Sequence, residues 1–433
     1  MCYKKREQRD RSISRTHERG VMVATQSERR LSLRQALEEM YLENPYPLYR
    51  QLREADPVYW DEEQGGCWVL TGYTDVMAGL RDQRFSAQRM DIGTDWIPAE
   101  LKERLEPPIT ALTKQILFLD PPDHTRLRGL VAKAFTPRMV EKLRPRIQKL
   151  VDELLAPAQE KGQMEVISEF AYPLPAIVIA EMLGVPPEDR ERFTQWTHDF
   201  GVLLDGGGGG LDFEQVVQAL LGVNEFMEYF RELIRQQRQT PRDNLLQAMQ
   251  EAEEQGDVLS EEELLGNCVL LLAAGHGTTT HLIGNGLLAL LRNPAQMEML
   301  RAEPALLPTA VAELLRYDSP VQLTSRVATT NLRIRDKEIP AGQEVLFCLG
   351  AANHDPAQFE HPDTLDLRRQ ENRHLAFGQG IHFCLGAPLA RVEAEIAFGS
   401  FLRTFANPRL ASETIEHFPS QVFRGLNALP VTL

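Results

Sequence analysis

A cysteine in a glycine-rich stretch is the residue of this sequence best suited to do chemistry. Cys384 lies in the stretch from Phe377 to Gly386, which reads Phe-Gly-Gln-Gly-Ile-His-Phe-Cys-Leu-Gly. The glycines permit backbone geometries that a side chain forbids. A helix predicted to begin near Leu385, with Pro388 tolerated in its first turn, would give the thiol a positive helix end and free amide N–H groups. Both favour a thiolate, a strong metal ligand, although a lone cysteine is often only a small buried hydrophobic residue.

The pattern around Cys384 resembles the haem-binding loop of the cytochromes P450. The positions that carry the resemblance are Phe377, Gly378, Gly380, His382, Cys384 and Gly386. The resemblance implies that Cys384 is the axial thiolate ligand of a haem iron and that Phe377, Gly378 and His382 also bind the cofactor. Because one motif alone could mislead, the other motifs of the family must appear upstream in the right order.

A helix predicted over residues 261–292 carries the second motif. Its run Ala274-Gly275-His276-Gly277-Thr278-Thr279 resembles the P450 oxygen-binding motif Ala/Gly-Gly-x-Asp/Glu-Thr-Thr. The resemblance implies that Ala274 and Gly275 let the helix lie against the flat haem. It also implies that Thr278 opens the backbone hydrogen-bond ladder and offers its hydroxyl to dioxygen. Tight crossing of two helices is the alternative explanation for so many poor helix formers.

One position departs from this motif. Gly277 stands where the family usually has an acid that is assigned a part in relaying protons to oxygen. Its absence implies that Thr278, water, a substrate group or the nearby His276 takes over that task, or that the enzyme releases peroxide. We therefore assign catalytic positions to Thr278, Gly277 and His276.

Glu313 and Arg316 lie three residues apart, on one face of a predicted helix, where an acid and a base can pair. Such a pair is usually a solvated surface feature. In this order before the cysteine loop, however, it resembles the P450 Glu-x-x-Arg motif, which is a structural ion-pair network. Many relatives complete that network with an arginine near position 364. Thr364 stands here, so the third partner remains open.

The two propionates of a haem call for cationic or hydrogen-bonding partners. The family supplies them from a His-x-x-x-Arg sequence, from an arginine after Glu-x-x-Arg, and from the histidine of the cysteine loop. The corresponding residues here are His124, Arg128, Arg326 and His382. Each alone is an ordinary surface residue type, but together and in this order they predict a propionate site.

Composition sets limits on the function. The formal net charge of −15 argues against a nucleic-acid partner. The five cysteines are odd in number, far apart and without a Cys-x-x-Cys pair, so we expect reduced thiols and a cytoplasmic protein. No apolar run approaches the roughly 20 residues that span a bilayer, so we expect no membrane association. Residues 1–30 are basic without an apolar core, which predicts a disordered leader before one P450 domain over 31–433.

The elements that must position these residues are mostly helices. Apolar spacing predicts helices over 33–55 (interrupted at 44–45), 73–80, 123–134, 140–156, 170–183, 188–204, 213–238, 244–254, 261–292 and 306–316, and strands over 58–60, 67–70, 325–328, 332–334 and 345–347. Residues 84–120 read as one long irregular loop, which is usually functional. Five glycines at 206–210 predict either a slack connection or the hinge of a lid. The fold class is mainly α with a small β portion, which agrees with the cytochrome P450 fold.

The resemblance implies a haem-thiolate monooxygenase that inserts one atom of O2 into a hydrophobic small molecule. The predicted substrate-binding residues, which are mostly apolar, are Leu270, Ala273, Ala274, Val321, Leu323 and Thr324. The sequence contains neither a dinucleotide fingerprint nor an iron–sulfur cysteine cluster. Electrons must therefore come from a separate protein, and the resemblance implies a small acidic ferredoxin or flavodoxin with its reductase. In the family layout Arg126, Lys133, Arg138 and Arg391 flank the cysteine side, where they would attract such a partner. We expect a monomer with haem b.

Two other functions remain open at this point. A peroxide-using or rearranging P450 would be consistent with Gly277 in place of the acid. A gas sensor or other non-catalytic haem protein would keep Cys384 as ligand without activating oxygen, and the presence of Thr278 argues against it.

Overall fold

The computed structural model describes residues 30–90, 97–205, 213–241, 244–254 and 259–433. The elements below belong to one unit, Ser32–Leu433. The basic leader predicted for residues 1–30 lies outside the described residues except for Arg30, and the five glycines at 206–210 lie outside them as well. The leader, the hinge and the single domain over 31–433 therefore stay predictions.

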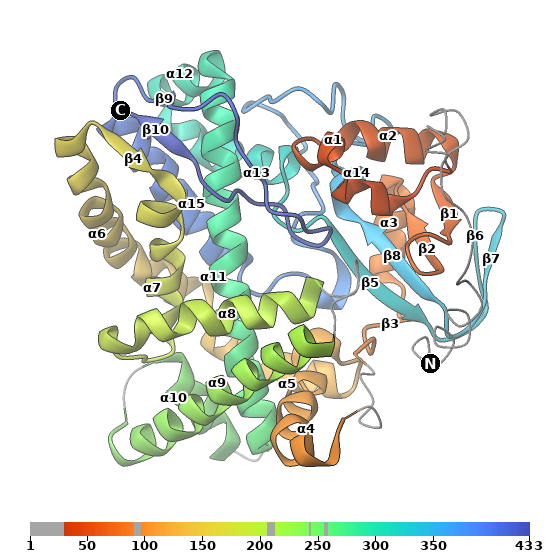
Figure 1. The fold of residues 1–433 in the computed structure, drawn as a ribbon. Coiled ribbons are helices and arrows are strands. Elements are labelled where there is room, and N and C mark those ends of the chain that lie inside the picture. Colours follow the sequence, from red (N-terminus) through yellow and green to blue (C-terminus); the bar gives the residue numbers. More distant parts are fainter. Residues whose placement is uncertain (1–29, 91–96, 206–212, 242–243, 255–258) are drawn as a thin grey trace, which may run out of the picture. The chain divides into compact units, whose positions relative to one another are not determined.

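Helices make up most of the described chain, which confirms the mainly α fold class (Figure 1). The α-helices are α1 (Glu39–Leu42), α2 (Tyr46–Ala55), α3 (Tyr73–Arg81), α4 (Ala99–Thr113), α5 (Asp123–Ala134), α6 (Pro137–Lys161), α7 (Pro173–Met182), α8 (Arg190–Asp205), α9 (Phe213–Gln239), α10 (Leu245–Glu254), α11 (Glu261–Arg292), α12 (Pro294–Ala302), α13 (Leu307–Tyr317), α14 (Leu349–Asn353) and α15 (Ala387–Thr404). Short turns of 3₁₀-helix are η2 (Leu33–Leu37), η3 (Ile116–Phe118), η5 (Pro187–Asp189), η6 (Pro304–Leu306) and η7 (Gly380–His382), and η4 (Ile167–Ala171) is a π-turn.

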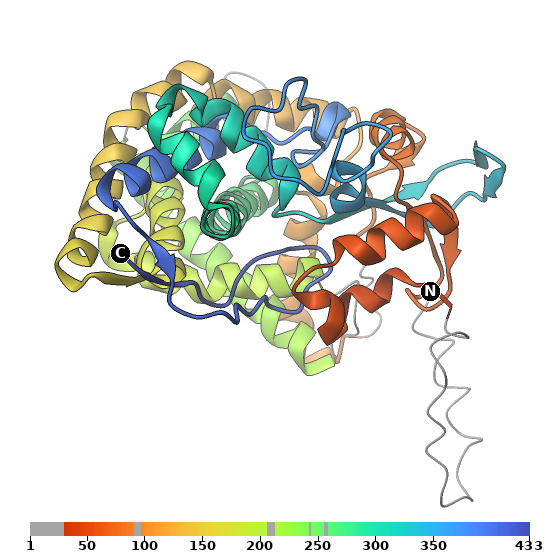
Figure 2. The same ribbon diagram turned by 90° about the horizontal axis from the view of Figure 1, so that it is seen from above.

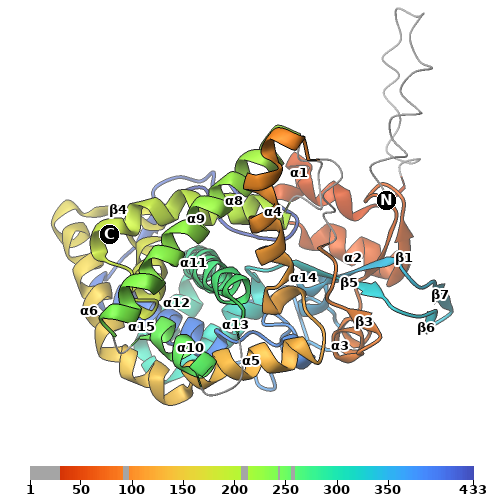
Figure 3. The same cartoon turned by 90° about the horizontal axis from the view of Figure 1, so that it is seen from below.

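Helix α11 organises the others. It begins at a capping box, in which the Ser260 hydroxyl accepts from the Glu263 amide and the Glu263 side chain accepts from the Ser260 amide. Its middle is almost continuously apolar and buried, so it must be covered on several sides. Figure 3 shows α11 nearly end-on, with α4, α9 and α15 around it. The predicted range of 261–292 is confirmed at both ends.

A five-stranded sheet holds the smaller β portion. Its strands are β1 (Val58–Asp61), β2 (Cys67–Leu70), β3 (Phe85–Ser86), β5 (Leu323–Ala328) and β8 (Glu344–Cys348), in the spatial order β1-β2-β8-β5-β3. Only the β2–β8 pair is parallel. Strand β5 lies between β8 and β3, so it carries Leu323, Thr324 and Arg326 inside the sheet.

Two smaller sheets complete the described strands. Strands β4 (Gln163–Glu165), β10 (Pro430–Thr432) and β9 (Arg409–Leu410) form one, and β6 (Leu332–Ile334) and β7 (Lys337–Ile339) form an antiparallel pair. The β6–β7 hairpin projects from the edge of the five-stranded sheet in Figures 1 and 2. The predicted strands at 58–60, 67–70, 325–328, 332–334 and 345–347 are all present.

The prediction of an irregular loop over 84–120 is wrong. This segment contains β3, the fifteen-residue helix α4 and η3. Pro107 and Pro108 lie inside α4, where each lacks the amide donor of an ordinary helical residue. The helix forms nonetheless because Leu105, Ile109 and Leu112, spaced at helical intervals, are buried in the core. Tertiary packing therefore overrides the poor local propensity.

None of the helices among the described residues has the length and apolar character needed to cross a bilayer. The four cysteines in the described part of the chain, Cys67, Cys268, Cys348 and Cys384, form no disulfide.

Candidate functional site

The cysteine loop is closed by its own backbone. The Cys384 amide donates to the Phe377 carbonyl at 2.9 Å, which turns the segment back on itself before α15 begins at Ala387. Gly378 and Gly380 have φ values of +67° and +73°, in the left-handed region that favours glycine. A Cβ at Gly380 would lie 2.5 Å from the Leu80 carbonyl oxygen of α3. The loop therefore needs glycine both for its turn and for its contact with α3.

The surroundings of the Cys384 sulfur combine burial with positive charge. Burial raises the pKa of the thiol, while the amides of Gly386 and Ala387 and the guanidinium groups of Arg128 and Arg391 lower it. Burial is the larger effect, so the helix end alone does not ionise the thiol as the sequence suggested. A metal cation at the sulfur would supply the missing favourable charge, since a coordinating thiol is deprotonated.

The four predicted propionate partners come together beside this loop. The rings of His124, on α5, and His382 lie 4.2 Å apart between centroids. The Arg128 guanidinium donates to the Phe383 carbonyl, next to Cys384. Arg326 is only 5% exposed and donates to the Ser325 carbonyl at 2.7 Å and the Thr324 hydroxyl at 3.2 Å.

A fifth basic residue, Arg89, joins this cluster, although no motif in the sequence points to it. Its guanidinium lies 4.8 Å from the ring centroid of Phe118 and donates to the Ala87 carbonyl at 3.2 Å. Arg89 follows β3, which pairs with β5, the strand of Arg326. Only this pairing, which is not evident from the sequence, brings the two arginines together.

The basic cluster, defined as Arg89, His124, Arg128, Arg326 and His382, is short of negative charge. Burial and the neighbouring Arg326 lower the pKa of Arg89 to about 9. Burial lowers the pKa of Arg326 to about 10, and burial with the surrounding cations lowers that of His382 to about 2. Both ring nitrogens of His124 and Nε2 of His382 are buried and have no hydrogen-bond partner among the described residues. A doubly anionic ligand with acceptor oxygens would relieve both deficits, and two propionates fit this description.

Helix α11 presents one partly open face. Between residues 264 and 290 every residue is buried except Ala274, Gly275, Gly277, Thr278 and His281. The Thr278 hydroxyl donates to the Ala274 carbonyl one turn earlier, at 2.8 Å. A Cβ built at Gly277 would meet nothing within 4 Å. The open face of α11, defined as Ala274, Gly277, Thr278 and His281, is therefore where a ligand can approach this helix.

Two residues of the oxygen-binding motif, Gly275 and His276, face neighbouring parts of the protein instead of the open face. A Cβ at Gly275 would lie 3.2 Å from the Ile179 side chain of α7, so this glycine serves the tight helix crossing that was the alternative explanation. His276 is buried against the Tyr172 ring, with centroids 4.1 Å apart, and burial lowers its pKa to about 4. It is two residues from Thr278, about 200° around the helix, so the structure does not bring the two side chains together.

The predicted substrate-binding residues lie on α11, β5 and the segment before β5. Leu270, Ala273 and Leu323 are buried, whereas Val321 and Thr324 are half-buried and Ala274 is exposed. Val321 forms an isolated antiparallel bridge with Phe423 of the C-terminal tail. Contact of these residues with a substrate stays a prediction.

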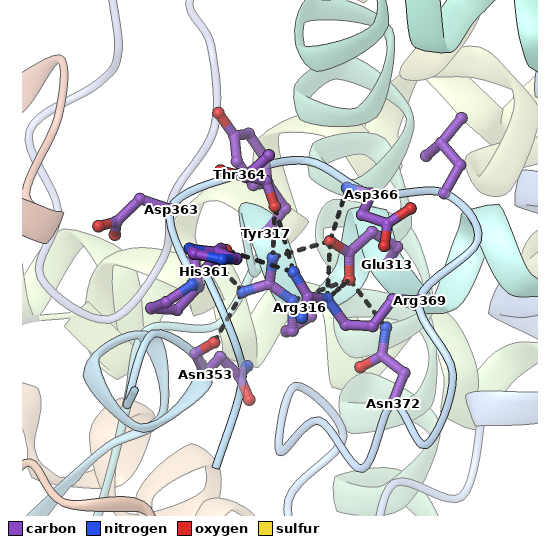
Figure 4. Close-up of polar contacts among 12 residues, drawn as sticks. Glu313, Arg316, Tyr317, Asn353, His361, Asp363, Thr364, Asp366, Arg369 and Asn372 are labelled. Atoms are coloured by element: carbon purple, nitrogen blue, oxygen red, sulfur yellow. Dashed lines mark hydrogen bonds and ion pairs between the residues drawn. The ribbon is translucent and has the colours of Figure 1, made fainter. Parts of the chain in front are cut away.

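The acid–arginine motif forms the buried network drawn in Figure 4. Arg316 donates to both carboxylate oxygens of Glu313 at 2.8 Å, and both side chains are fully buried. The third partner is Arg369, whose Nε donates to the same carboxylate at 3.0 and 3.2 Å. Thr364 contributes only its main-chain carbonyl, which accepts from both arginines. This network holds the loop over 361–372, which leads into the cysteine loop.

The helical fold, the cysteine loop and the basic cluster together define a protein that binds haem through a cysteine. A family model described as "Cytochrome P450" matches residues 212–421. A relative named Cytochrome P450 CYP107DY1, from Priestia megaterium, is 44% identical over 378 residues, covering 85% of this chain and 90% of the relative. The chain therefore belongs to the cytochrome P450 family, and it is an oxidoreductase of the monooxygenase type.

Two solved structures are similar over nearly the whole chain. One is P450BioI in complex with an acyl carrier protein that carries hexadec-9Z-enoic acid: it has a TM-score of 0.85 and 38% identity, and the match covers 92% of this chain and 100% of that one. The other is the myxobacterial cytochrome P450 CYP267B1 in complex with myristic acid, with a TM-score of 0.83, 41% identity, and coverage of 92% and 98%.

Proposed function

We propose that this P450 inserts one oxygen atom of O2 into a C–H bond or double bond of a hydrophobic small molecule. The two electrons come from a separate ferredoxin or flavodoxin with its reductase. The observation that carries this proposal is the basic cluster beside Cys384. Its buried His124 and Arg326 and its half-buried Arg89, Arg128 and His382 are opposed only in part, by Asp120 and Glu344, so the cluster suits an anionic cofactor.

The residues of the loop and the cluster are those that would hold the haem. Cys384 would bind the iron, Arg89, Arg128, Arg326 and the two histidines would pair with the propionates, and the exposed Ala274 on α11 would lie against the ring. The sequence has no Cys-x-x-Cys-His motif for attachment of a c-type haem, and we propose haem b as the cofactor. When bound, a cysteine-ligated haem iron supplies the activation of dioxygen and the cleavage of its O–O bond.

The chain itself must deliver protons to the oxygen. The Thr278 hydroxyl is held on the open face of α11 by its hydrogen bond to the Ala274 carbonyl. By rotating about its side-chain torsion, the same hydroxyl can donate toward the ligand side. Gly277 leaves no carboxylate beside it, so the proton that Thr278 gives away must be replaced from elsewhere.

The electron donor must approach from the cysteine side of the protein. Arg138 on α6 and Ile381 in the cysteine loop are both exposed, and we propose that both belong to the face that the donor covers. Arg126 forms ion pairs with Glu263 and Asp123, so it contributes less free charge than the sequence suggested. The side chain of Lys133 lies outside the described residues. An acidic partner would pair with Arg138 and cover Ile381.

Substrates with a long apolar chain fit best with what is known of similar structures. P450BioI and CYP267B1 were solved with a hexadecenoyl group and with myristic acid. Three of the predicted lining residues are not fully buried: Ala274, Val321 and Thr324. Because two of these three are apolar, the accessible part of the predicted lining is largely apolar. We propose fatty acyl chains or natural products of comparable size as substrates, for a monomeric enzyme that acts in the cytoplasm with reduced cysteines.

The test combines spectroscopy with turnover. We expect the reduced carbon monoxide complex to show the red-shifted thiolate band, and Cys384→Ser to lose that band while still binding haem. We also expect product from a fatty acid with NADH, ferredoxin and reductase. Product with peroxide alone, without partner-driven product despite demonstrated haem reduction, would favour the peroxide-using alternative, for which Gly277 is the supporting observation. Reduction without product from either oxidant would favour a haem sensor.

A further inference from the structure

Arg391 on α15 lies over an aromatic ring of the cysteine loop. Its guanidinium carbon is 4.9 Å from the ring centroid of Phe377, a distance at which a cation is attracted to the face of a ring. Both side chains are half-buried. Within the described part of the chain this guanidinium has no carboxylate partner, whereas Arg144 pairs with Glu395 of the same helix at 3.2 Å. The charge of Arg391 is therefore not offset by an acid.

The Phe377 ring that carries Arg391 is held next to Cys384. The Cys384 amide donates to the Phe377 carbonyl at 2.9 Å, so the two residues are joined across the loop. The ring also packs between those of His374 and Phe383, with centroids 5.7 and 6.2 Å away. A ring held by these contacts fixes where the guanidinium lies relative to the loop.

The charge of Arg391 reaches the Cys384 sulfur. Arg391 and Arg128 are the two side chains whose positive charges lower the pKa of the Cys384 thiol. The same charge acts on the neighbouring imidazole, because burial, followed by the charges of Arg391 and Arg316, lowers the pKa of His374 to about 3. His374 is therefore neutral at pH 7 and adds no further cation beside Phe377.

The two arginines near the sulfur have different surroundings. Arg128 belongs to the basic cluster and donates to the Phe383 carbonyl, where it would pair with a propionate. The negative charge of that propionate would offset the charge of Arg128 at the sulfur. Arg391 lies outside the basic cluster and has no acid partner among the described residues. Its charge therefore stays available to the thiolate when the cofactor is bound.

We propose that Arg391, stacked on Phe377, is a further positioning residue of the haem site, which limits the electron donation of the Cys384 thiolate and so makes the iron easier to reduce. This inference rests on the proposed function, in which a donor protein supplies the electrons. A cation near the thiolate favours the reduced iron, which carries one positive charge less than the oxidised iron. One electron passes from the donor protein to the iron, and Arg391 gains and loses no proton.

The test is a redox titration of the haem-loaded protein in which charge and packing are changed separately. We expect the equilibrium constant for one-electron reduction of the iron to fall about tenfold in Arg391→Gln, which corresponds to a potential about 59 mV more negative. Arg391→Lys keeps a cation that can lie over the ring, and should stay within about threefold of the wild type. Arg144→Gln is the matched control, because it removes a cation that an acid of the same helix already offsets, and it should leave the constant unchanged.

A vibrational measurement reports on the thiolate itself. Stronger donation from the sulfur strengthens the iron–sulfur bond and weakens the C–O bond of bound carbon monoxide. We therefore expect Arg391→Gln to raise the iron–sulfur stretching frequency of the oxidised protein and to lower the C–O stretching frequency of the reduced carbon monoxide complex. An unchanged potential together with unchanged frequencies would overturn the proposal. Slower reduction by ferredoxin in that case would identify Arg391 as a docking contact only.

A second neutral variant covers the case in which Arg391→Gln retains no haem. Arg391→Met fills the same space over Phe377 without a charge and should show the same shifts. Loss of haem in both neutral variants but not in Arg391→Lys would support the proposal, because the thiolate then needs the charge to hold the iron. Loss of haem in all three would overturn it, in favour of a purely structural stack. None of these measurements needs turnover, so a wild type without partner-driven product would refute the proposed function, while the potential still decides the role of Arg391.

Discussion

Arg369 Nε donates to both carboxylate oxygens of Glu313, which lies fifty-six residues earlier in the chain. Glu313 also accepts from Arg316, from the Asp366 amide and from the Asn372 side chain, so its buried charge is compensated from several sides. The ion pair thereby fastens the loop before the cysteine loop to α13.

Replacing Arg369 with Leu should therefore destabilise the protein strongly. It leaves a carboxylate that is 0% exposed with one guanidinium instead of two, a change that costs about 3–5 kcal/mol in other buried networks. We expect a lower midpoint of thermal unfolding and poor haem retention. Thr364→Ala is the matched control, because the arginines use only the Thr364 carbonyl, and it should change stability by less than about 0.5 kcal/mol.

Gly277→Glu should raise the fraction of electrons that reach product. The new side chain has room, since a Cβ at this position meets nothing within 4 Å, and it would restore the acid next to Thr278. Peroxide release per NADH is the measurement. Equal release in variant and wild type would show that proton delivery does not limit coupling in this enzyme.

Gly266→Ala should weaken the contact between α11 and α4. A Cβ at Gly266 would lie 2.4 Å from the Ala111 carbonyl oxygen, and backbone atoms cannot move aside as a flexible side chain can. We expect a loss of about 1–3 kcal/mol, measured by chemical unfolding. Gly277→Ala on the same helix meets no neighbour and should be neutral or slightly stabilising, because alanine is the better helix former. A similar loss in both variants would mean that the close helix contact is not the cause.

Glu393→Gln should change how stability depends on pH. Glu393 on α15 is 1% exposed, and burial raises its pKa to about 8 from an ordinary value of 4.5. The folded state therefore holds more protons than the unfolded state between these two values, so this group makes the protein less stable as pH rises from about 5 to 8. The glutamine variant lacks that loss and should exceed the wild type in unfolding free energy at pH 8 by more than about 1 kcal/mol. Parallel pH curves for the two proteins would contradict the raised pKa.

Much of the helical framework can be predicted because its signals are local. The Ser260–Glu263 capping box and the apolar run that follows define α11 to the residue. Helix α4 could not be predicted, because Pro107 and Pro108 oppose it locally and only burial of Leu105, Ile109 and Leu112 reveals why it forms.

The residues of the candidate site also fall into those that the sequence predicts and those that it does not. Cys384, His124, Arg128, Arg326 and His382 follow from motif order, and the structure gathers them. Arg89 and Arg369 could not be predicted from the sequence. Arg89 reaches the basic cluster through the pairing of β3 with β5, and Arg369 reaches Glu313 through the path of a loop, and no local pattern specifies either. Gly275 and His276 lie in the motif but face α7 and Tyr172, since a helix turns them away from Thr278.

The parallel pairing of β2 with β8 has a consequence for biosynthesis. Val69 near the beginning of the chain pairs with Leu346, and the Tyr73 amide donates to the Asp355 carboxylate at 2.8 Å. The β1–β2 hairpin therefore has no partner strand at the free edge of β2 until β8, late in the chain, has been synthesised. Such long-range pairing makes folding slow, so we expect the sheet to close after synthesis, and nascent chains to depend on chaperones until then.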